Sequence, residues 1–566
     1  MRLTTLLLAA VAAIAAVTVG SVKPHEASVA VLVNQVGYDS QATKILVVQV
    51  RDPETGEPAS FQLVTEGGEV AYTGKLIPRG RVHEGTSSDW GARYWTGDFT
   101  GCRKAGRYRA RVSLGPKDAF SFPFQIGNHV LFLETAEFAA RFFYWQRCGF
   151  AIPGIHAACH LDDGKLTAEL GGGYRNVAGG WHDAGDYNKY NGYTPASVYA
   201  LAVLARDAAK LLTPQGRKQV LEESIWGGDF IYKMWQPGKG IMYTEVYSGW
   251  AHWGPPEKET DNIPGNADDR PIRGQGPNAM ASAAMAALAR VSGKVKYREA
   301  AEDLWRGAEA ALKGGASPHM LLADLELHQL TKDNRYDEGA ARRVESLLKV
   351  QAADGLWQPD IGEYGIRPAA LALYVKAHPK SALSKSILAA LRRWLDRSLQ
   401  IADNPFQLTP YSEGVFFRPY ADQKTWYVGQ NTQYLSQAWA LYLVGALLHD
   451  LRAGQMADRQ LDWVLGMNPA NLCMMEGRGS YNLPLYHHAY TGNSRRKKAG
   501  IPGQERGAIP GAIPNGVCRP EGYLDKPFVF FGVITTLPPA PPPIGTTEPW
   551  LPHNAYYLQA ITAKNR

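Results

Sequence analysis

Long apolar runs and dense basic patches are both scarce in this chain, and its net charge of +7 is spread along its length. Beyond the N-terminus, apolar stretches such as ALYLVGALLHD are too short and too interrupted to span a bilayer. The one dense basic run, Arg495–Lys498, is typical of a solvated loop, because nucleic-acid-binding proteins usually present a larger basic face. We therefore expect no nucleic-acid partner.

Cysteine is scarce as well. The chain has five cysteines, an odd number, so at least one lies outside any internal disulfide. In an oxidising exterior, Cys473 and Cys518 are candidates for a disulfide.

The N-terminal segment is the exception to the missing apolar runs. In MRLTTLLLAAVAAIAAVTVGSV one Arg precedes a run of small apolar residues, and polar residues then return. This order is typical of a signal peptide, which we place at residues 1–27. The run is just long enough that an uncleaved anchor is the alternative. We expect a secreted protein, extracellular or periplasmic, without membrane contact after cleavage.

The length of 566 residues predicts more than one domain. Residues 28–124 alternate between apolar and polar positions in short segments separated by Gly, Pro and Asp turns. Roughly seven such segments predict an N-terminal β-sandwich, placed at residues 28–127. The 15 Trp and 28 Tyr residues include candidates for stacking on sugar rings, although most aromatic side chains belong to cores.

From residue 131 onward the hydrophobic period becomes helical, so residues 131–566 are predicted to form an all-α domain. The predicted helices cover 133–148, 195–212, 218–235, 278–293, 298–313, 369–379, 382–399, 431–466 and 554–565. Many amphipathic helices joined by long loops suit a ring of helix pairs, although periodicity alone indicates only an all-α fold. The proline-rich stretch before the last helix is interpreted as a rigid loop, because too few residues follow it for another module.

Two thiols and two imidazoles form a group that stands out by its chemistry: Cys148, Cys159, His160 and His182. Two Cys and two His are the donors of a closed tetrahedral zinc site. Their spacing is not that of a zinc finger, and a disulfide between the two thiols is the alternative.

The segment GGWHDAGDYNKY, residues 179–190, places Asp183 and Asp186 in one short loop. Such a pair can bind a metal, hold a water for attack, or simply form a polar turn. Glycoside hydrolysis needs a further, protonated carboxyl on the other side of the bond. Glu548 is the candidate, because it lies beside Trp550 among prolines and apolar surroundings raise the pKa of a carboxyl.

This loop resembles the signature of glycoside hydrolase family 9, which holds cellulases and related β-glycan hydrolases. Other segments agree in order. VLVNQVGYDSQATKILVV is similar to the immunoglobulin-like domain that precedes the catalytic domain in one branch, and QRCG and AACHLDD are similar to that branch's zinc site. HWGPPE resembles a cleft segment, LDWVLGMNP leads toward a second signature, and Glu548 with Asn554–Ala555 keeps the spacing of the final motif. The resemblance implies an (α/α)6 barrel behind an immunoglobulin-like β-sandwich.

The resemblance also implies the roles of the three acids in an inverting reaction. Asp186 is implied as the general base, Asp183 as a second holder of the attacking water, and Glu548 as the general acid. Gly185 is expected to let the loop bend tightly enough to aim both aspartates. The Cys and His group is implied as a structural zinc site, and no organic cofactor is expected.

Sugar contacts are expected around these acids. His487 is implied by the second signature, and Trp253, Trp426 and Tyr427 are candidate stacking platforms that can equally be core residues.

The second signature and its surroundings also depart from the family pattern. Tyr486 and Ala489 stand where the family has Pro and Arg, and Arg495 or Arg496 is a candidate substitute for the missing Arg. Glu476 replaces a small hydroxyl residue.

TDNIPGNADDRP carries Asp261, Asp268 and Asp269 among turns. Such a segment can hold Ca²⁺ through oxygen ligands, as the family often does, although the spacing is not that of an EF-hand and a solvated loop is the alternative.

We therefore expect a secreted, monomeric, inverting endo-β-1,4-glucanase acting on cellulose, cello-oligosaccharides or mixed-linkage glucan. The altered second signature favours two alternatives. One is an exo-acting β-glucosidase or β-glucosaminidase of the same family. The other is a carbohydrate-binding protein without catalysis, against which the retained acids argue.

Overall fold

The computed structural model describes residues 26–566 apart from 115–116, 154–155, 249–255, 257–258, 360–362, 420–429, 485, 490–508, 521–523 and 532–543. The predicted signal peptide, except for its last two residues, therefore lies outside the described part. None of the described helices is long and apolar enough to cross a membrane.

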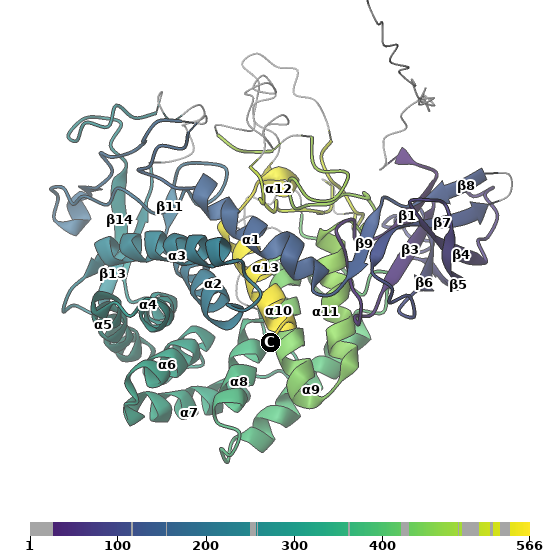
Figure 1. Cartoon of the computed structure of the whole chain (residues 1–566). Helices are drawn as coiled ribbons and strands as arrows, with labels where there is room; N and C mark the ends of the chain where they lie inside the picture. The colour runs from purple at the N-terminus through teal and green to yellow at the C-terminus, as the bar shows by residue number, and fades with distance from the viewer. Residues whose placement is uncertain are drawn as a thin grey trace, which may run out of the picture.

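The N-terminal region is a two-layered arrangement of strands that pair antiparallel except for one parallel pair, which confirms the predicted β-sandwich (Figure 1). Its strands are β1 (Val29–Leu32), β2 (Gly37–Asp39), β3 (Ile45–Val50), β4 (Ser60–Thr65), β5 (Val70–Arg81), β6 (Arg93–Asp98), β7 (Gly106–Leu114), β8 (Lys117–Phe120) and β9 (Phe124–Gly127). The order is β1-β3-β6-β5-β4-β7-β9-β2, with β8 paired to β7, and the long β5 joins the two layers. Val48, Phe61 and Trp95 lie in the core between them.

The rest of the chain is helical. Its α-helices are α1 (Val130–Trp145), α2 (Thr194–Asp207), α3 (Pro214–Met234), α4 (Ala279–Ser292), α5 (Val295–Leu312), α6 (Pro318–Thr331), α7 (Asn334–Lys349), α8 (Ile366–Ala377), α9 (Ser384–Ile401), α10 (Gln430–Leu448), α11 (Leu451–Val464), α12 (Ile544–Thr547) and α13 (Leu551–Lys564). A small sheet lies at one side of the barrel and comprises β10 (Lys165–Leu166), β11 (Lys189–Tyr190), β12 (Trp235–Gln236), β13 (Ile241–Val246) and β14 (Pro271–Gly276).

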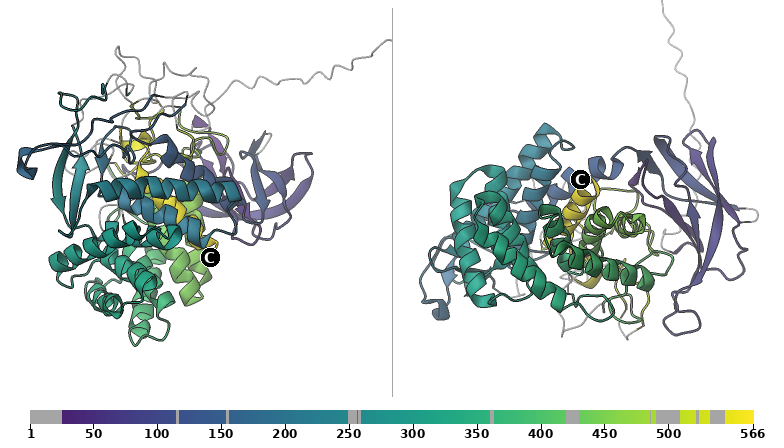
Figure 2. Two further views of the ribbon diagram at one scale, coloured as in Figure 1. Left: turned by 60° about the vertical axis from the view of Figure 1, so that its left-hand side comes forward. Right: turned by 90° about the horizontal axis from the view of Figure 1, so that it is seen from below.

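Six of the helices form a closed inner ring. Each of α2, α4, α6, α8, α10 and α13 packs against the next, and α13 packs back against α2. The helices α1, α3, α5, α7, α9 and α11 lie outside it, as the view from below shows (Figure 2). An outer helix buries one stripe, such as Tyr336, Ala340 and Val344 of α7, whereas the inner helix α10 is buried on nearly every side. The predicted (α/α)6 barrel is confirmed.

Two parts of the helix prediction need correction. The helices α6 and α7 were not predicted. The predicted helix 431–466 is two helices, because the chain turns at His449, with φ of 50°, and Asp450 then caps α11 by accepting a hydrogen bond from Arg452 N–H.

The sandwich and the barrel share a packed seam. The Asn34 amide donates to Asp462 of α11 at 2.9 Å, and the Trp90 indole donates to the Asp525 carbonyl at 2.9 Å. The Trp90 ring also packs 5.1 Å from that of Phe417. The two domains therefore bury polar and aromatic side chains against each other.

Candidate active site

The segment 182–188, called the acid loop below, is held by the residue that follows α1. Gln146 donates its side-chain amide to the carbonyls of His182 at 3.1 Å and Ala184 at 2.7 Å. Its own carbonyl accepts from His182 N–H, and its side-chain oxygen lies 2.9 Å from His488 Nε2. A single buried glutamine therefore fixes the loop and one histidine of the second signature together.

Gly185 allows the second signature to lie directly against the acid loop. A Cβ at this position would overlap the carbonyl oxygen of His487, and Ala489 N–H donates to the Gly185 carbonyl at 2.6 Å. The φ of Gly185 is not in the left-handed region. The glycine is thus required for close approach rather than for the tight bend that the sequence predicts.

The chain returns to this loop just before α13 and brings Glu548 with it. Gly185 N–H donates to Glu548 Oε1 at 3.2 Å, and Leu551 N–H donates to the Asp183 carbonyl at 3.0 Å. Asp183, Asp186 and Glu548, called the acid cluster below, lie where α2 and α13 begin, and each is less than a tenth exposed. The structure thus brings together the three acids that the sequence singles out.

The three carboxyls differ in the groups that face them. Burial raises the pKa of Asp186, but Asn188 stabilises its ionised form through N–H and amide bonds of 3.0 and 2.8 Å. Burial and then the charge of Asp186 hold the pKa of Glu548 well above its usual value. The pair is therefore suited to one ionised and one protonated carboxyl near neutral pH.

Asp183 is covered by a tryptophan. The indole N–H of Trp550 donates to Asp183 Oδ2 at 2.8 Å, and the Trp550 ring packs edge-on against Tyr193 at 4.5 Å. Asp183 Oδ1 is buried and accepts no hydrogen bond from any described residue. Burial, followed by the charge of Asp186, holds the pKa of Asp183 well above its usual value.

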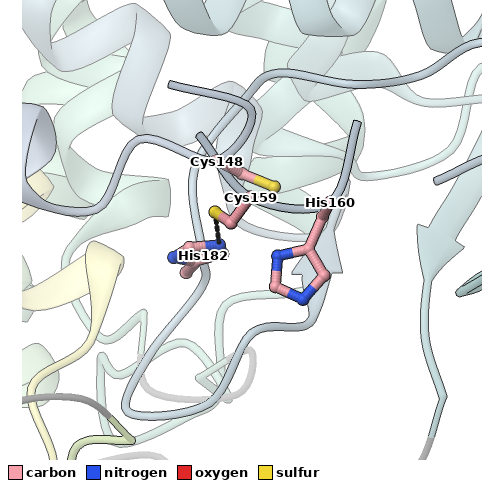
Figure 3. Close-up of side chains that lie close together, drawn as sticks. All are labelled: Cys148, Cys159, His160 and His182. Carbon is pink, nitrogen blue, oxygen red and sulfur yellow. Dashed lines mark hydrogen bonds between the residues drawn. The ribbon is translucent and has the colours of Figure 1, made fainter. Parts of the chain in front are cut away.

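The four predicted metal ligands converge beside the acid loop and form the metal cluster, composed of Cys148, Cys159, His160 and His182. One donor atom from each lies within 4.8 Å of every other, all four side chains are buried, and Figure 3 shows them gathered around one point. Cys159 Sγ lies 3.8 Å from His182 Nε2. The donors come from the segment just after α1, from residues 159–160 and from the acid loop.

The donor types of the metal cluster fit a divalent cation, but its two thiols differ in pKa, because the hydrogen bond to Cys148 and burial hold the pKa of Cys159 well above its usual value. Burial alone would raise the pKa of Cys148, but the Cys159 hydrogen bond and the charge of Lys189 hold it well below its usual value. Burial lowers the pKa of His182 to about 4, so its imidazole is neutral and available as a donor. All five cysteines are free thiols, so neither this pair nor Cys473 with Cys518 forms a disulfide.

The structure does not place every predicted sugar contact. Trp253, Trp426 and Tyr427, together with Arg495 and Arg496, lie outside the described residues. His487 is 7% exposed and its backbone lies against Gly185.

Glu476 lies inside the protein. Its carboxylate accepts a hydrogen bond of 2.8 Å from Tyr486, and both side chains are buried. Glu476 and Tyr486, which both differ from the family pattern, therefore form a hydrogen bond with each other.

Sequence reasoning missed three residues that shape the acid cluster: Gln146, Asn188 and Trp550 as a hydrogen-bond donor. Of these, only Asn188 carried a local signal, because an Asn two residues after an Asp commonly bonds back to it in a turn.

A family model described as glycosyl hydrolase family 9 matches residues 132–528, more than half of the chain. The chain belongs to glycosyl hydrolase family 9. A second model, described as a cellulase N-terminal ig-like domain, matches residues 26–114. Both assignments agree with the resemblance seen in the sequence.

The curated relatives that match this chain are distant in sequence. A cellodextrinase of Butyrivibrio fibrisolvens is 27% identical over 250 residues, which cover 41% of this chain and 43% of that protein. A xyloglucan-specific endo-beta-1,4-glucanase of Bacteroides ovatus is 28% identical over 250 residues, covering 40% and 39% of the two chains. The match thus spans about two fifths of each relative.

The likeness in structure is far more extensive. The crystal structure of a metagenome-derived family 9 endoglucanase aligns with a TM-score of 0.69 and 23% identity, covering 95% of this chain and 99% of that one. The two proteins therefore share the fold over both domains.

Proposed function

We propose that this family 9 protein is a secreted inverting glycoside hydrolase that cleaves β-1,4-linked glucans. One observation carries the proposal. Glu548 accepts a hydrogen bond from Gly185, the residue that lies between the two aspartates in the sequence of the acid loop. Family membership, and the cellodextrinase and endo-beta-1,4-glucanase names of the relatives, support this substrate class.

In this proposal the acids divide the proton transfers between them. Asp186, held ionised by Asn188, takes a proton from the attacking water. Asp183 Oδ1, which accepts no bond from a described residue, is a second acceptor for that water. Glu548 gives its proton to the leaving glycosidic oxygen. Attack from the face opposite the leaving group inverts the anomeric carbon.

The metal cluster has a structural role in this proposal. Two thiolates and two neutral imidazoles would hold zinc with all four positions filled by protein, so the ion supplies rigidity and no open site for chemistry. Because His182 precedes Asp183, the ion would fix one end of the acid loop.

Endo-cleavage of the polymer is the leading form of this activity. The narrow surroundings of the acids favour a second form, the release of short units from one chain end. Trp550 covers Asp183, and the three acids are 4–9% exposed.

The test is a product profile on cello-oligosaccharides, mixed-linkage glucan and chitosan oligomers, with anomer-resolved NMR of the first products. We expect α-anomers from the β-linked glucans. Internal cuts support the endo form, and monomer or dimer release supports the exo form. First products of the β-anomer would contradict inversion, and no cleavage of any substrate would leave a carbohydrate-binding protein.

A further inference from the structure

A groove on the outer wall of the barrel, called the outer groove below, has no part in the site described above. It lies between the neighbouring helices α1 and α3 (Figure 1) and encloses about 400 Å³. That volume lies within the range of about 300–1,000 Å³ that is common for small-molecule sites. Buried Ala140 of α1 and Val220 of α3 line the groove and give it an apolar base.

Two aromatic residues at the end of α1 add ring surface to the outer groove. Tyr144 and Trp145 both line it and are half-buried, and their ring centroids lie 5.3 Å apart. The guanidinium group of Arg147 packs over Tyr144 at 5.1 Å, and that of Arg141 packs over Trp145 at 5.5 Å. These contacts hold the two rings in place, and fixed aromatic surface suits the apolar faces of sugar rings.

The outer groove also offers polar groups that the protein does not use itself. The Tyr144 hydroxyl and the Gln219 amide make no hydrogen bond with any described residue, and the Arg141 guanidinium makes neither a hydrogen bond nor an ion pair with one. A hydroxyl, an amide and a guanidinium group can donate and accept the hydrogen bonds that sugar hydroxyls make.

The charge of the outer groove favours a neutral ligand. Three carboxylates line it, from Glu137, Glu222 and Glu223. Glu223 accepts from Arg147 at 2.8 Å, and Glu137 accepts from Thr213 N–H at 2.6 Å. An anion would lie beside these carboxylates and be repelled, whereas a neutral chain of hydroxyl groups would not.

We propose that the outer groove binds a short segment of a β-1,4-linked glucan chain, away from the acid cluster. The choice of glucan rests on the proposed function, whereas the preference for a neutral, hydroxyl-rich chain rests on the groove itself. The groove ends at Trp145 and Arg147, the residues on either side of Gln146, which holds the acid loop. A polymer bound both there and at the acid cluster would be retained more strongly than one bound at the acid cluster alone.

The test uses the full chain with Asp186→Ala, so that the probe, cellotetraose, is not hydrolysed. Titration calorimetry measures how many cellotetraose molecules bind per chain. Tyr144→Phe/Gln219→Ala removes two unused polar groups and keeps the ring, and Gln219→Trp fills the groove. Each should bind about one cellotetraose fewer per chain or weaken that site by about 10-fold or more, since one hydrogen bond contributes up to about 10-fold in affinity.

Gln400→Trp is the matched control, because Gln400 is exposed on α9 and does not line the outer groove. It should bind as many cellotetraose molecules as the Asp186→Ala parent. With Asp186 restored, the groove variants should hydrolyse cellotetraose with unchanged kcat/KM, which shows that they are folded and that the acid cluster is intact.

Two results would overturn the proposal. One is equal number and affinity of bound cellotetraose in the groove variants and the control. The other is equal binding of trigalacturonate, an anionic sugar chain, at the groove. If the unaltered protein hydrolyses no glucan, the proposed function fails, but the difference of about one cellotetraose between the groove variants and Gln400→Trp still decides whether the outer groove binds it.

Discussion

His182 and Asp183 are neighbours in the chain, yet they belong to two clusters in which burial has different net outcomes for the pKa values of the acidic groups. In the acid cluster the pKa values of Asp183 and Glu548 are held well above their usual range by burial and by the charge of Asp186. In the metal cluster burial acts in the same direction on Cys148, but a thiol hydrogen bond and Lys189 outweigh it.

The comparison shows that depth of burial alone does not decide the protonation of a group. Neighbouring charges and hydrogen bonds can reinforce burial, as at Glu548, or outweigh it, as at Cys148. In the proposed function, the metal cluster holds a cation, and the acid cluster keeps a proton on Glu548 and delivers it. The two clusters meet at the peptide bond between His182 and Asp183. A variant in one cluster can therefore be tested for its effect on the other.

The largest effect is expected from removing the general base. Asp186→Ala should lower the rate of hydrolysis by at least about 10²-fold, because general base catalysis contributes that much or more. The melting temperature and zinc content should stay close to those of the unaltered protein, since a loop acid carries little packing. Near-normal turnover in a folded variant would contradict the assignment of Asp186.

A large effect on stability is expected from breaking the metal cluster. Cys159→Ser should abolish bound zinc and lower the melting temperature by about 5 °C or more, because structural metal binding is coupled to folding. Cys518→Ser is the matched control, since Cys518 is a buried free thiol outside the cluster. Elemental analysis and calorimetry measure both quantities. Equal zinc content in the two variants would contradict the proposed zinc site at the metal cluster.

A smaller effect is expected from removing the hydrogen bond that joins Trp550 to Asp183. Trp550→Phe keeps an aromatic ring against Tyr193 but removes the N–H that Asp183 accepts. We expect kcat to fall by up to about 10-fold with KM nearly unchanged, because a hydrogen bond contributes about 0.5–1.5 kcal/mol and about 1.4 kcal/mol corresponds to a tenfold change in rate. Tyr193→Phe, which keeps the ring contact and the indole bond, should be near normal. A rise in KM alone would instead make Trp550 a binding residue.

The smallest effect is expected on the pH dependence of stability. The folded protein holds the Glu548 proton more tightly than the unfolded chain, so this group's stabilising contribution is complete below the ordinary Glu pKa and is lost as pH rises toward the raised value. Glu548→Gln removes this loss. Its melting temperature should exceed that of the unaltered protein by about 1–3 °C at pH 8, with the difference shrinking toward pH 4. A constant difference across that range would contradict the raised pKa.

Much of the fold can be predicted from the hydrophobic period of the sequence, but the closed inner ring of helices cannot. The sandwich strands and most helices have clear alternation or helical stripes. Inner helix α6 is buried on most sides and carries Asp324 and Glu326, so it shows no clean stripe. The break at His449 has no Gly or Pro to mark it. Closure of the ring depends on contacts between distant helices, which no local pattern contains.

The residues of the candidate site also divide into those that a local pattern predicts and those that it does not. The acids and metal ligands were predictable because their residue types and motifs lie within short segments. Gln146 and Trp550 act across 38 and 367 residues of sequence, and their roles come only from folding. The predicted acidic segment shows the same cause, because distant Asp162 lies with Asp261 and Asp268, whereas Asp269 accepts a hydrogen bond from Gly265 N–H.

The seam between sandwich and barrel bears on how such proteins diversify. Asn34 reaches Asp462, and Trp90 packs on Phe417, so cutting the gene between the two domains would expose an aromatic face and leave a buried carboxylate without its donor. We expect a domain attached in this way to be inherited with its barrel rather than exchanged between genes. Shuffling should therefore succeed only when both halves of the seam move together.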